Sequence, residues 1–252
     1  MPRPCENDMS GGAPSGPVRT ITIPGWLENS ITGPPFSSRK NLVFRVRWGG
    51  KARVAKVFSG EFWDRAGTEY ELLGLCRDAK IRAPRPLVLK DNVVIMTSLR
   101  GRPAFELLYV ADVRVRASRA AILDGVAGWL ARFHKAFRWE RQRGDSIAKN
   151  FMCAGTGVAG FDFEESAEGD PLADVGQFCA HLLASGDCFT PPLFEAAGYF
   201  ASRYRRHSGR DRSDELPEAV SNGLEHYARF RRDGALLRSW AKKIRGRGLK
   251  ML

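Results

Sequence analysis

Short runs of alternating apolar and polar residues dominate the N-terminal part of the chain. Leu42–Trp48 is rich in valine and aromatic residues and alternates from Phe44 onward, and a second such run, Ala52–Phe58, follows the pair Gly49-Gly50. Two β-rich runs on either side of a glycine pair predict a hairpin. The next segment, Trp63–Arg77, has its apolar residues near helical spacing and is stopped by prolines, which predicts one helix of about four turns.

The rest of the chain changes from strands to helices. Leu87–Leu89 and Val93–Met96 predict two more strands around a turn, and residues 98–103 resemble a linker. Helical patterns follow at residues 105–110 and 117–137 and begin again at about 174, 193 and 218. A small hairpin is expected between residues 150 and 163, with glycines at its turn. The order predicts a strand-rich part with one helix, a hinge and a helix-rich part.

Composition places the chain among globular proteins. With 252 residues, 43% of them hydrophobic, it can bury the core of one two-lobed domain or two small ones. No segment approaches the roughly 18 to 20 uninterrupted apolar residues of a membrane span. We therefore expect a cytoplasmic protein, with peripheral attachment to the inner membrane surface left open. Residues 1–17 are rich in glycine, proline and serine without apolar periodicity, so a flexible tail is expected there.

A lysine in the second predicted strand is the first candidate for chemistry. Lys56 has apolar neighbours on both sides, and an ammonium in such a strand needs a counter-charge. Glu69 in the following helix is the natural partner and Glu71 its competitor, because residues two apart face different sides of a helix. The apolar pattern does not decide between them. The alternative is a solvated edge-strand lysine with two solvated acids.

Two loops in the second half carry a more specific pattern. Asp145 and, after four intervening residues, Asn150 precede the predicted hairpin, and Asp162-Phe163-Glu164 follows it. This is the arrangement of kinase catalytic and metal-binding loops. Phosphoryl transfer requires a lysine for the phosphates, oxygen ligands for magnesium and a carboxylate beside the acceptor hydroxyl. The alternative is a turn residue at Asp145 and a capping amide at Asn150.

These motifs together resemble the protein-kinase-like superfamily, and within it the aminoglycoside and choline phosphotransferase branch. A looser likeness links the chain to lipopolysaccharide-core kinases and to small atypical kinases of tRNA-modifying complexes. The resemblance covers residues 42–184 and includes Lys56, Glu69–Leu73, Ile81–Pro86, Met96–Gly101, Leu130–His134, the two loops, Gly169–Pro171 and Asp174. It implies an α+β, two-lobed kinase-like fold. A small strand-rich N-lobe with one main helix would span residues 18–97, and a larger helical C-lobe with a basic C-terminal tail would span 98–252.

The resemblance also implies roles for individual residues. Asp145 would be the catalytic base, with Lys56 and Glu69 as the phosphate anchor. Asn150 and Asp162 would be magnesium ligands, and Asp174 would brace the catalytic loop, a role compatible with capping a helix. The backbone at Thr97, Ser98 and Leu99 would contact the adenine of ATP.

Three features depart from the family pattern. Gly33–Ser38 offers one glycine and two prolines where a glycine-rich phosphate loop is expected, and proline lacks an amide donor. Arg143 stands where the phosphotransferase branch usually has histidine. Glu164 stands where protein kinases have glycine, which favours the small-molecule branch.

The C-terminal part is strongly basic, and the whole chain has a formal charge of +12. Its cationic residues are Arg203, Arg205, Arg206, Arg229, Arg231, Arg232, Arg238, Lys242, Lys243, Arg245, Arg247 and Lys250, with Tyr204, Tyr227, Phe230 and Trp240 interleaved. Two interpretations stay open: a site for an anionic partner such as a lipid headgroup, glycan phosphate or nucleic acid, or a solvated face whose aromatic residues pack inward.

The sequence thus predicts an ATP- and Mg-dependent phosphotransferase that phosphorylates a hydroxyl of a small molecule or glycan. The alternatives are an atypical protein kinase and a catalytically weak nucleotide- or polyanion-binding scaffold of the same fold. A cationic acceptor fits the charge of +12 only if a local acidic pocket overrides it. Glu164, Glu165, Glu168 and Asp170 are the candidates for such a pocket.

Overall fold

The computed structural model describes residues 21–36, 38, 40–109, 116–155 and 157–249. The tail expected at residues 1–17 lies outside this range. The described chain divides into two compact units. The strand-rich unit contains residues 21–100 and 159–165, and the helical unit contains residues 101–158 and 166–249. Residues 159–165, expected in the C-lobe, therefore group with the strands, because Gly160 N donates to Arg82 O (3.1 Å) and Phe163 N donates to the Glu69 carboxylate (2.7 Å).

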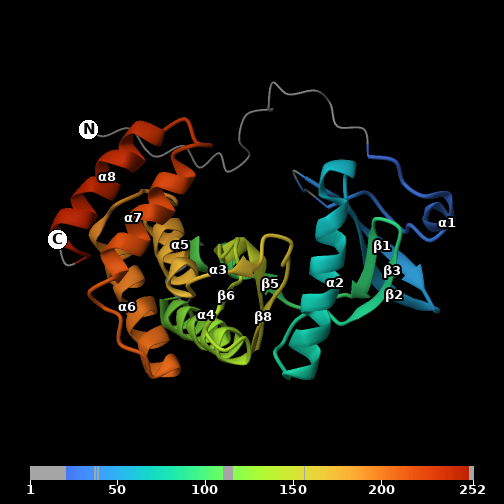
Figure 1. Ribbon diagram of the computed structural model, residues 1–252, viewed down its shortest axis with the longest axis horizontal. Helices are drawn as coiled ribbons and strands as arrows, with labels where there is room; N and C mark the ends of the chain where they lie inside the picture. The colour runs from blue at the N-terminus through green and yellow to red at the C-terminus, as the bar shows by residue number, and fades with distance from the viewer. Residues whose placement is uncertain (1–20, 37, 39, 110–115, 156, 250–252) are drawn as a thin grey trace. The chain divides into compact units, whose positions relative to one another are not determined.

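An antiparallel sheet forms the core of the strand-rich unit (Figure 1). Its strands are β1 (Leu42–Trp48), β2 (Lys51–Val57), β3 (Pro86–Lys90) and β4 (Val93–Thr97), in the order β1-β2-β4-β3. The predicted hairpin is confirmed, since Trp48 pairs with Lys51 across Gly49 and Gly50, whose φ angles of 56° and 72° suit glycine. Inward side chains of β1, β2 and β4 form a buried cluster with Leu27 from the short helix α1 (Gly25–Glu28).

The predicted helix of the strand-rich unit is confirmed as α2 (Trp63–Asp78), preceded by a 3-10 turn at Gly60–Phe62. Its buried face carries Ala66, Glu69, Leu72, Leu73 and Cys76, and the helix packs on the β3–β4 side of the sheet. A carboxylate thus lies on an otherwise apolar helix face. Because Glu69 lies among apolar residues, the apolar pattern of the sequence could not show which of Glu69 and Glu71 points inward.

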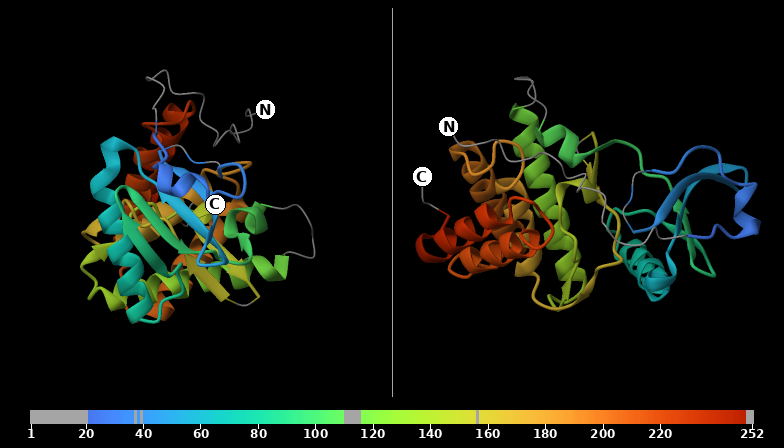
Figure 2. Two further views of the ribbon diagram at one scale, coloured as in Figure 1. Left: turned by 90° about the vertical axis from the view of Figure 1, so that its right-hand side faces the viewer. Right: turned by 90° about the horizontal axis from the view of Figure 1, so that it is seen from above.

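Six helices make up most of the described helical unit (Figures 1 and 2). They are α3 (Ala104–Tyr109), α4 (Arg116–Ala136), α5 (Leu172–Leu183), α6 (Pro191–Ser208), α7 (Leu216–Tyr227) and α8 (Gly234–Arg247). Helix α5 packs against α6 and α7, α4 packs against α6, and α7 packs against α8. The contact between α5 and α7 requires glycine at position 176, because a Cβ atom there would lie 2.3 Å from the backbone of Ala219.

Short strands in the chain's second half hold the two candidate loops. β5 (Arg102–Pro103), β7 (Phe151–Ala154) and β8 (Gly157–Gly160) form a three-stranded sheet. β6 (Arg141–Gln142) pairs with β9 (Ala167–Glu168), and a 3-10 turn, Ala148–Asn150, precedes β7. The loop 143–147 is therefore anchored at both ends by hydrogen-bonded structure.

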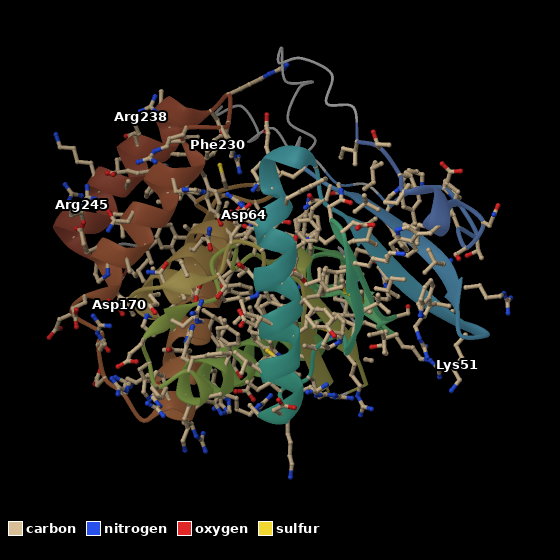
Figure 3. The ribbon with its side chains drawn as sticks, turned by 45° about the vertical axis from the view of Figure 1, so that its right-hand side comes forward. Lys51, Asp64, Asp170, Phe230, Arg238 and Arg245 are labelled. Atoms are coloured by element: carbon tan, nitrogen blue, oxygen red, sulfur yellow. The ribbon has the colours of Figure 1, made fainter. Side chains whose placement is uncertain are left out.

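The basic C-terminal residues, expected as a face or tail, are spread over several elements: Arg203–Arg206 lie in α6, Arg229–Arg232 precede α8, and Arg238–Arg247 lie in α8, while Lys250 is outside the described residues. Leu237, Ala241 and Ile244 are buried, while Arg238 and Arg245 point outward (Figure 3). Trp240 stacks on Phe189 with ring centroids 4.7 Å apart, whereas Phe230 is 70% exposed. Most of the interleaved aromatic residues thus pack inward.

No helix in the described residues is long and apolar enough to cross a bilayer.

Candidate active site

Lys56 in β2 is the centre of a charge cluster within the strand-rich unit. Its Nζ lies 2.5 Å from Asp162 Oδ1, 2.8 Å from Glu164 Oε2 and 3.4 Å from Glu69 Oε2. The Lys56 side chain is 7% exposed and the Asp162 side chain 36% exposed. Three carboxylates around one ammonium leave a net negative cluster, and Asp162 is its solvent-facing member.

Glu69 is the inward acid of α2, and Glu71 is exposed. The question left open by the sequence is therefore decided in favour of the pair Lys56 and Glu69. Besides facing Lys56, Glu69 Oε2 accepts a hydrogen bond from Phe163 N at 2.7 Å. One carboxylate from the helix thus fixes both the strand lysine and the backbone beside Asp162. Asp162 itself has φ of 68°, a left-handed conformation that non-glycine residues adopt at a cost of about 1–2 kcal/mol.

The charge states of this cluster follow from burial and proximity. Burial by itself lowers the pKa of Lys56, but the carboxylates of Asp162, Glu69 and Glu164 outweigh it and raise the pKa above its ordinary value. Burial raises the pKa of Glu69, against the opposing effect of Lys56. The lysine is therefore a fixed positive charge, as a phosphate anchor requires.

Glu164 and its neighbours are site residues whose partners the sequence did not identify. Asn41, which is 3% exposed, donates its side-chain amide to the Glu164 carboxylate, and Glu165 pairs with Lys40 and Arg65. In the helical unit, both oxygens of Asp170 pair with Arg212. Three of the four acids proposed as an acidic pocket are therefore already engaged by basic or amide partners.

The segment expected to meet adenine follows β4. Thr97 N donates to Arg85 O at 3.0 Å, and Arg85 N donates back to Thr97 Oγ1 at 2.8 Å. The N–H of Thr97 is thus already used inside the strand-rich unit. Ser98 is exposed and Leu99 is half-buried, and the Ser98 hydroxyl donates to Leu99 O at 3.4 Å.

Asp174 organises the Asp145 loop in the helical unit. Its side chain, 1% exposed, accepts hydrogen bonds from Arg143 N (2.5 Å), Gly144 N (3.0 Å) and Ser146 Oγ (2.8 Å). Ser146 N donates to Gln177 Oε1 (2.6 Å), one turn further along α5. The start of α5 therefore sets the backbone of the loop that carries Asp145.

Asn150 and Arg143 fix Asp145 from either side. Asn150 Nδ2 lies 2.9 Å from both the backbone oxygen and the Oδ2 of Asp145. Arg143, at the position where the related branch has histidine, is fully buried; its guanidinium donates to the Asp145 backbone oxygen and lies 5.1 Å from the centre of the Phe151 ring. The loop is thus braced by an arginine instead of a histidine.

A buried histidine extends this network away from the loop. His134 Nε2 lies 2.9 Å from Asp174 Oδ2, and His134 Nδ1 lies 2.8 Å from the hydroxyl of Tyr204 in α6. Because a carboxylate only accepts, Nε2 carries a proton, and Nδ1 accepts the hydrogen bond from the Tyr204 hydroxyl. Burial, with Asp174 and Asp170 nearby, raises the pKa of Tyr204, so its hydroxyl remains a donor. The sequence placed His134 within the family resemblance but gave it no partner.

Each unit carries one of the oxygen donors expected to hold magnesium. Asp162 offers a partly exposed carboxylate, and the Asn150 amide oxygen is separate from the nitrogen that holds Asp145. Mg²⁺ prefers such oxygen ligands and keeps several positions for water and phosphate. Within the described residues, no three His, Cys, Asp or Glu side chains form a metal site on their own.

Comparisons with known proteins show the fold. No family model matches the chain, and no curated protein sequence matches it. Among solved structures, an amicoumacin kinase bound to AMP-PNP, Ca²⁺ and Ami is similar with a TM-score of 0.60 at 12% identity, covering 88% of this chain and 87% of that one. Choline kinase from Cryptosporidium parvum is similar with a TM-score of 0.55 at 13% identity, covering 90% and 94%. WaaP in complex with acyl carrier protein is similar with a TM-score of 0.51 at 15% identity, covering 86% and 88%.

The chain therefore has the two-lobed protein-kinase-like fold. The α+β class and the resemblance expected from the sequence are confirmed at the level of the fold. Its structural neighbours include an amicoumacin kinase and a choline kinase.

Proposed function

We propose that the chain is an ATP- and Mg²⁺-dependent phosphotransferase whose acceptor is a hydroxyl of a small molecule or glycan. The observation that carries the proposal is the Lys56 cluster, in which a buried lysine is held by Glu69 and lies beside the solvent-facing carboxylate of Asp162. The fold is one that kinases use, and the second required group, Asp145 with Asn150, is held in an ordered loop.

In the proposed reaction, Lys56 binds the α- and β-phosphates and Glu69 keeps its side chain extended. Asp145 accepts the proton of the acceptor hydroxyl while the hydroxyl oxygen forms a bond to the γ-phosphorus of ATP. The bond between that phosphorus and the oxygen that bridges it to the β-phosphate breaks, and ADP leaves. Asp162 and Asn150 would hold Mg²⁺, which when bound neutralises charge on the phosphate oxygens. Asp174 keeps the loop backbone fixed, so the carboxylate of Asp145 needs little reorganisation.

The acceptor is proposed to be neutral or anionic. The chain has a formal charge of +12, and Glu164, Glu165 and Asp170 are occupied by partners within their own units. A polycationic acceptor would have to displace those partners.

Two variants test the proposal separately at its two groups. Asp162→Ala should abolish MgATP binding measured by isothermal titration calorimetry, while Asp64→Ala, at an exposed position of α2, should bind as the wild type does. Asp145→Asn should reduce turnover roughly 10²- to 10⁴-fold in a labelled-ATP screen of hydroxylated acceptors and leave nucleotide affinity within about twofold. A wild-type protein that binds no nucleotide would refute the proposal.

A catalytically weak scaffold is the second candidate, because Gly33–Ser38 lacks the glycines of a phosphate loop. Nucleotide binding without turnover on any acceptor would favour it. Transfer to a generic protein substrate, with none to small molecules, would instead favour an atypical protein kinase. The predictions of an anionic partner at the basic C-terminal region and of a cytoplasmic or peripheral location stay predictions.

A further inference from the structure

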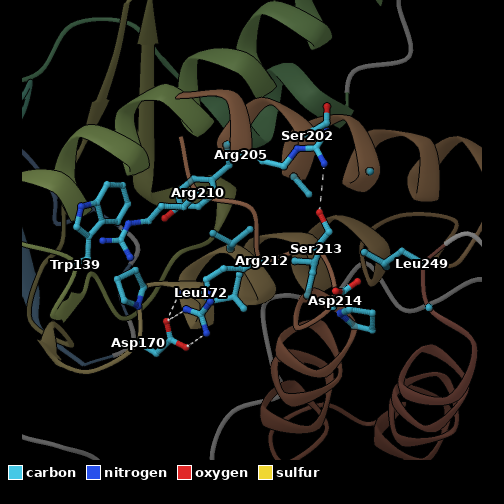
Figure 4. Close-up of a pocket in the computed structure, with 18 of the residues that line it drawn as sticks. Trp139, Asp170, Leu172, Ser202, Arg205, Arg210, Arg212, Ser213, Asp214 and Leu249 are labelled. Carbon is cyan, nitrogen blue, oxygen red and sulfur yellow. Dashed lines mark hydrogen bonds and ion pairs between the residues drawn. The ribbon is translucent and has the colours of Figure 1, made fainter. Parts of the chain in front are cut away.

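A cavity of about 450 Å³ lies in the helical unit, apart from the Asp145 loop (Figure 4). Its walls come from the start of α5, from α6, from the connection 210–214 and the start of α7, and from the end of α8. Trp139, just after α4, closes one side. The volume is in the range of sites that hold a small organic ligand.

The interior of this cavity is apolar and open. Leu172, Val175, Ala201 and Leu216 are among its lining residues. Gly198, an exposed residue of α6, also lines it. The cavity can therefore accept an apolar body of several carbon atoms.

The lining is cationic. Arg205, Arg210, Arg212 and Arg247 line the cavity, against two acids, Asp170 and Asp214. Arg212 is used by Asp170 and Glu215. Arg210 instead lies over the Trp139 ring, 4.4 Å from its centre, and within the described residues neither Arg210 nor Arg247 has a carboxylate at ion-pair distance. Two guanidinium groups are thus available to an anion.

A hydrogen-bond chain joins this cavity to the Asp145 loop. Tyr204, a wall residue, bonds to His134 (2.8 Å), and His134 bonds to Asp174 (2.9 Å), which holds the N–H groups of Arg143 and Gly144. The links from Tyr204 through His134 and Asp174 to Arg143 N are buried, and the link to Gly144 N is partly buried. A ligand that packs against the Tyr204 ring would restrict Tyr204 to the position that donates to His134, and the loop would open less often.

We propose that this cavity binds a small organic anion, a phosphate or carboxylate on an apolar body, and that binding stabilises the Asp145 loop through Tyr204, His134 and Asp174. The apolar lining contacts the apolar part of the ligand, and Arg210 and Arg247 pair with its anionic group. Tyr204 and His134 are positioning residues in this scheme. Neither the binding nor its effect on the loop depends on the proposed phosphotransferase activity.

Phenyl phosphate is the probe for the binding step. In full-length protein labelled with 5-fluorotryptophan, the Trp139 resonance, assigned with Trp139→Phe, should shift and saturate as phenyl phosphate is added. Inorganic phosphate alone should bind more weakly because it leaves the apolar lining exposed. Vesicles of phosphatidic acid form a second arm, and a Trp139 shift with vesicles but not with phenyl phosphate would overturn the small-ligand proposal.

Variants of exposed residues show whether the cavity is responsible. Arg210→Gln and Arg247→Gln should each weaken phenyl phosphate binding roughly tenfold, the value of one charge-assisted hydrogen bond. Arg206→Gln, a matched exposed arginine of α6 outside the cavity, should have no effect. Gly198→Phe should fill the cavity and abolish binding. Equal losses in Arg206→Gln and Arg210→Gln would show a diffuse surface effect and overturn the proposal.

Hydrogen exchange tests the link to the loop. Phenyl phosphate should slow amide exchange at residues 143–146 in the wild type and in Arg206→Gln. Tyr204→Phe should still bind phenyl phosphate within about twofold, since its ring remains, but the exchange rates of the loop should no longer respond. His134→Gln interrupts the same series of hydrogen bonds at a second residue. Unchanged loop exchange in the saturated wild type would overturn the coupling.

Discussion

The Lys56 cluster and the Asp145 loop hold their key side chains by different physical means. The first balances buried charges: one ammonium faces three carboxylates, with pairing distances of 2.5 to 3.4 Å. The second uses one buried carboxylate, Asp174, as the acceptor for backbone and side-chain donors. The comparison indicates that the stability of the Lys56 cluster should respond to pH and to charge removal, and that of the Asp145 loop to loss of a single acceptor.

Removal of the Asp174 carboxylate should have the largest effect on stability. Asp174→Ala leaves the N–H groups of Arg143 and Gly144, the hydroxyl of Ser146 and the ring of His134 without their acceptor. At about 1–3 kcal/mol for each unsatisfied buried donor, a loss of at least about 4 kcal/mol in unfolding free energy is expected. Urea denaturation measures it. Asp78→Ala, at an exposed position, serves as the control, and equal midpoints would contradict the bracing role.

Removal of the Lys56 charge should have the next largest effect and a distinct pH dependence. Lys56→Met leaves Glu69 and Glu164 facing each other, at a cost of about 3 kcal/mol at pH 7. Burial already raises the pKa of Glu69, and loss of the cation would raise it further. A group with a raised folded-state pKa stabilises the fold below its unfolded pKa, and this contribution disappears as pH rises. The loss of unfolding free energy in Lys56→Met should therefore become smaller as the pH falls from 7 to 5.

Urea midpoints of Lys56→Met at several pH values measure this trend. The control is Lys51→Met, at an exposed lysine of the same strand. A deficit that stays constant between pH 5 and pH 8 would show that packing, and not charge balance, is what Lys56 contributes.

A buried histidine in the helical unit supplies a smaller test. His181 is 2% exposed, its Nε2 lacks a hydrogen-bond partner in the described structure, and burial, with Lys149 and Arg231 nearby, lowers its pKa to about 3. A lowered folded-state pKa means that stability is present above the unfolded value of about 6.5 and is lost as pH falls. About 2 kcal/mol should be lost between pH 6.5 and pH 5, at about 1.4 kcal/mol per unit.

His181→Phe should remove most of this acid sensitivity, because a phenyl ring cannot take up the proton. His226→Gln, at an exposed position, should retain it. The same slope in all three proteins, measured by urea unfolding, would assign the acid sensitivity to other groups.

The smallest expected effect separates the two acids of α2. Glu71 is exposed, so Glu71→Gln should change the unfolding free energy by less than about 0.5 kcal/mol. Glu69→Gln should cost about 2 kcal/mol, because the amide cannot balance Lys56 and accepts less strongly from Phe163 N. Thermal unfolding of both variants under one buffer condition compares them. Equal changes in unfolding free energy in the two variants would mean that the buried position of Glu69 does not contribute to stability.

The sequence alone determined the features that depend on local order. Alternation and the glycine pair gave the β1–β2 hairpin, helical spacing gave α2 and α4, and the spacing of Asp145, Asn150 and Asp162 indicated kinase-like loops. These features depend on residues that are close in the chain, where backbone geometry and apolar periodicity are informative.

Only the tertiary structure decided the partners of the buried charges. It placed Glu69 rather than Glu71 against Lys56, gave Glu164 the amide of Asn41, and linked Tyr204 through His134 to Asp174. Asn41 and Glu164 are separated by 123 residues, and His134 and Tyr204 by 70. Local periodicity carries no information about such distant pairs, because their contact follows from the packing of whole helices and strands and from the cost of burying a charge or donor without a partner.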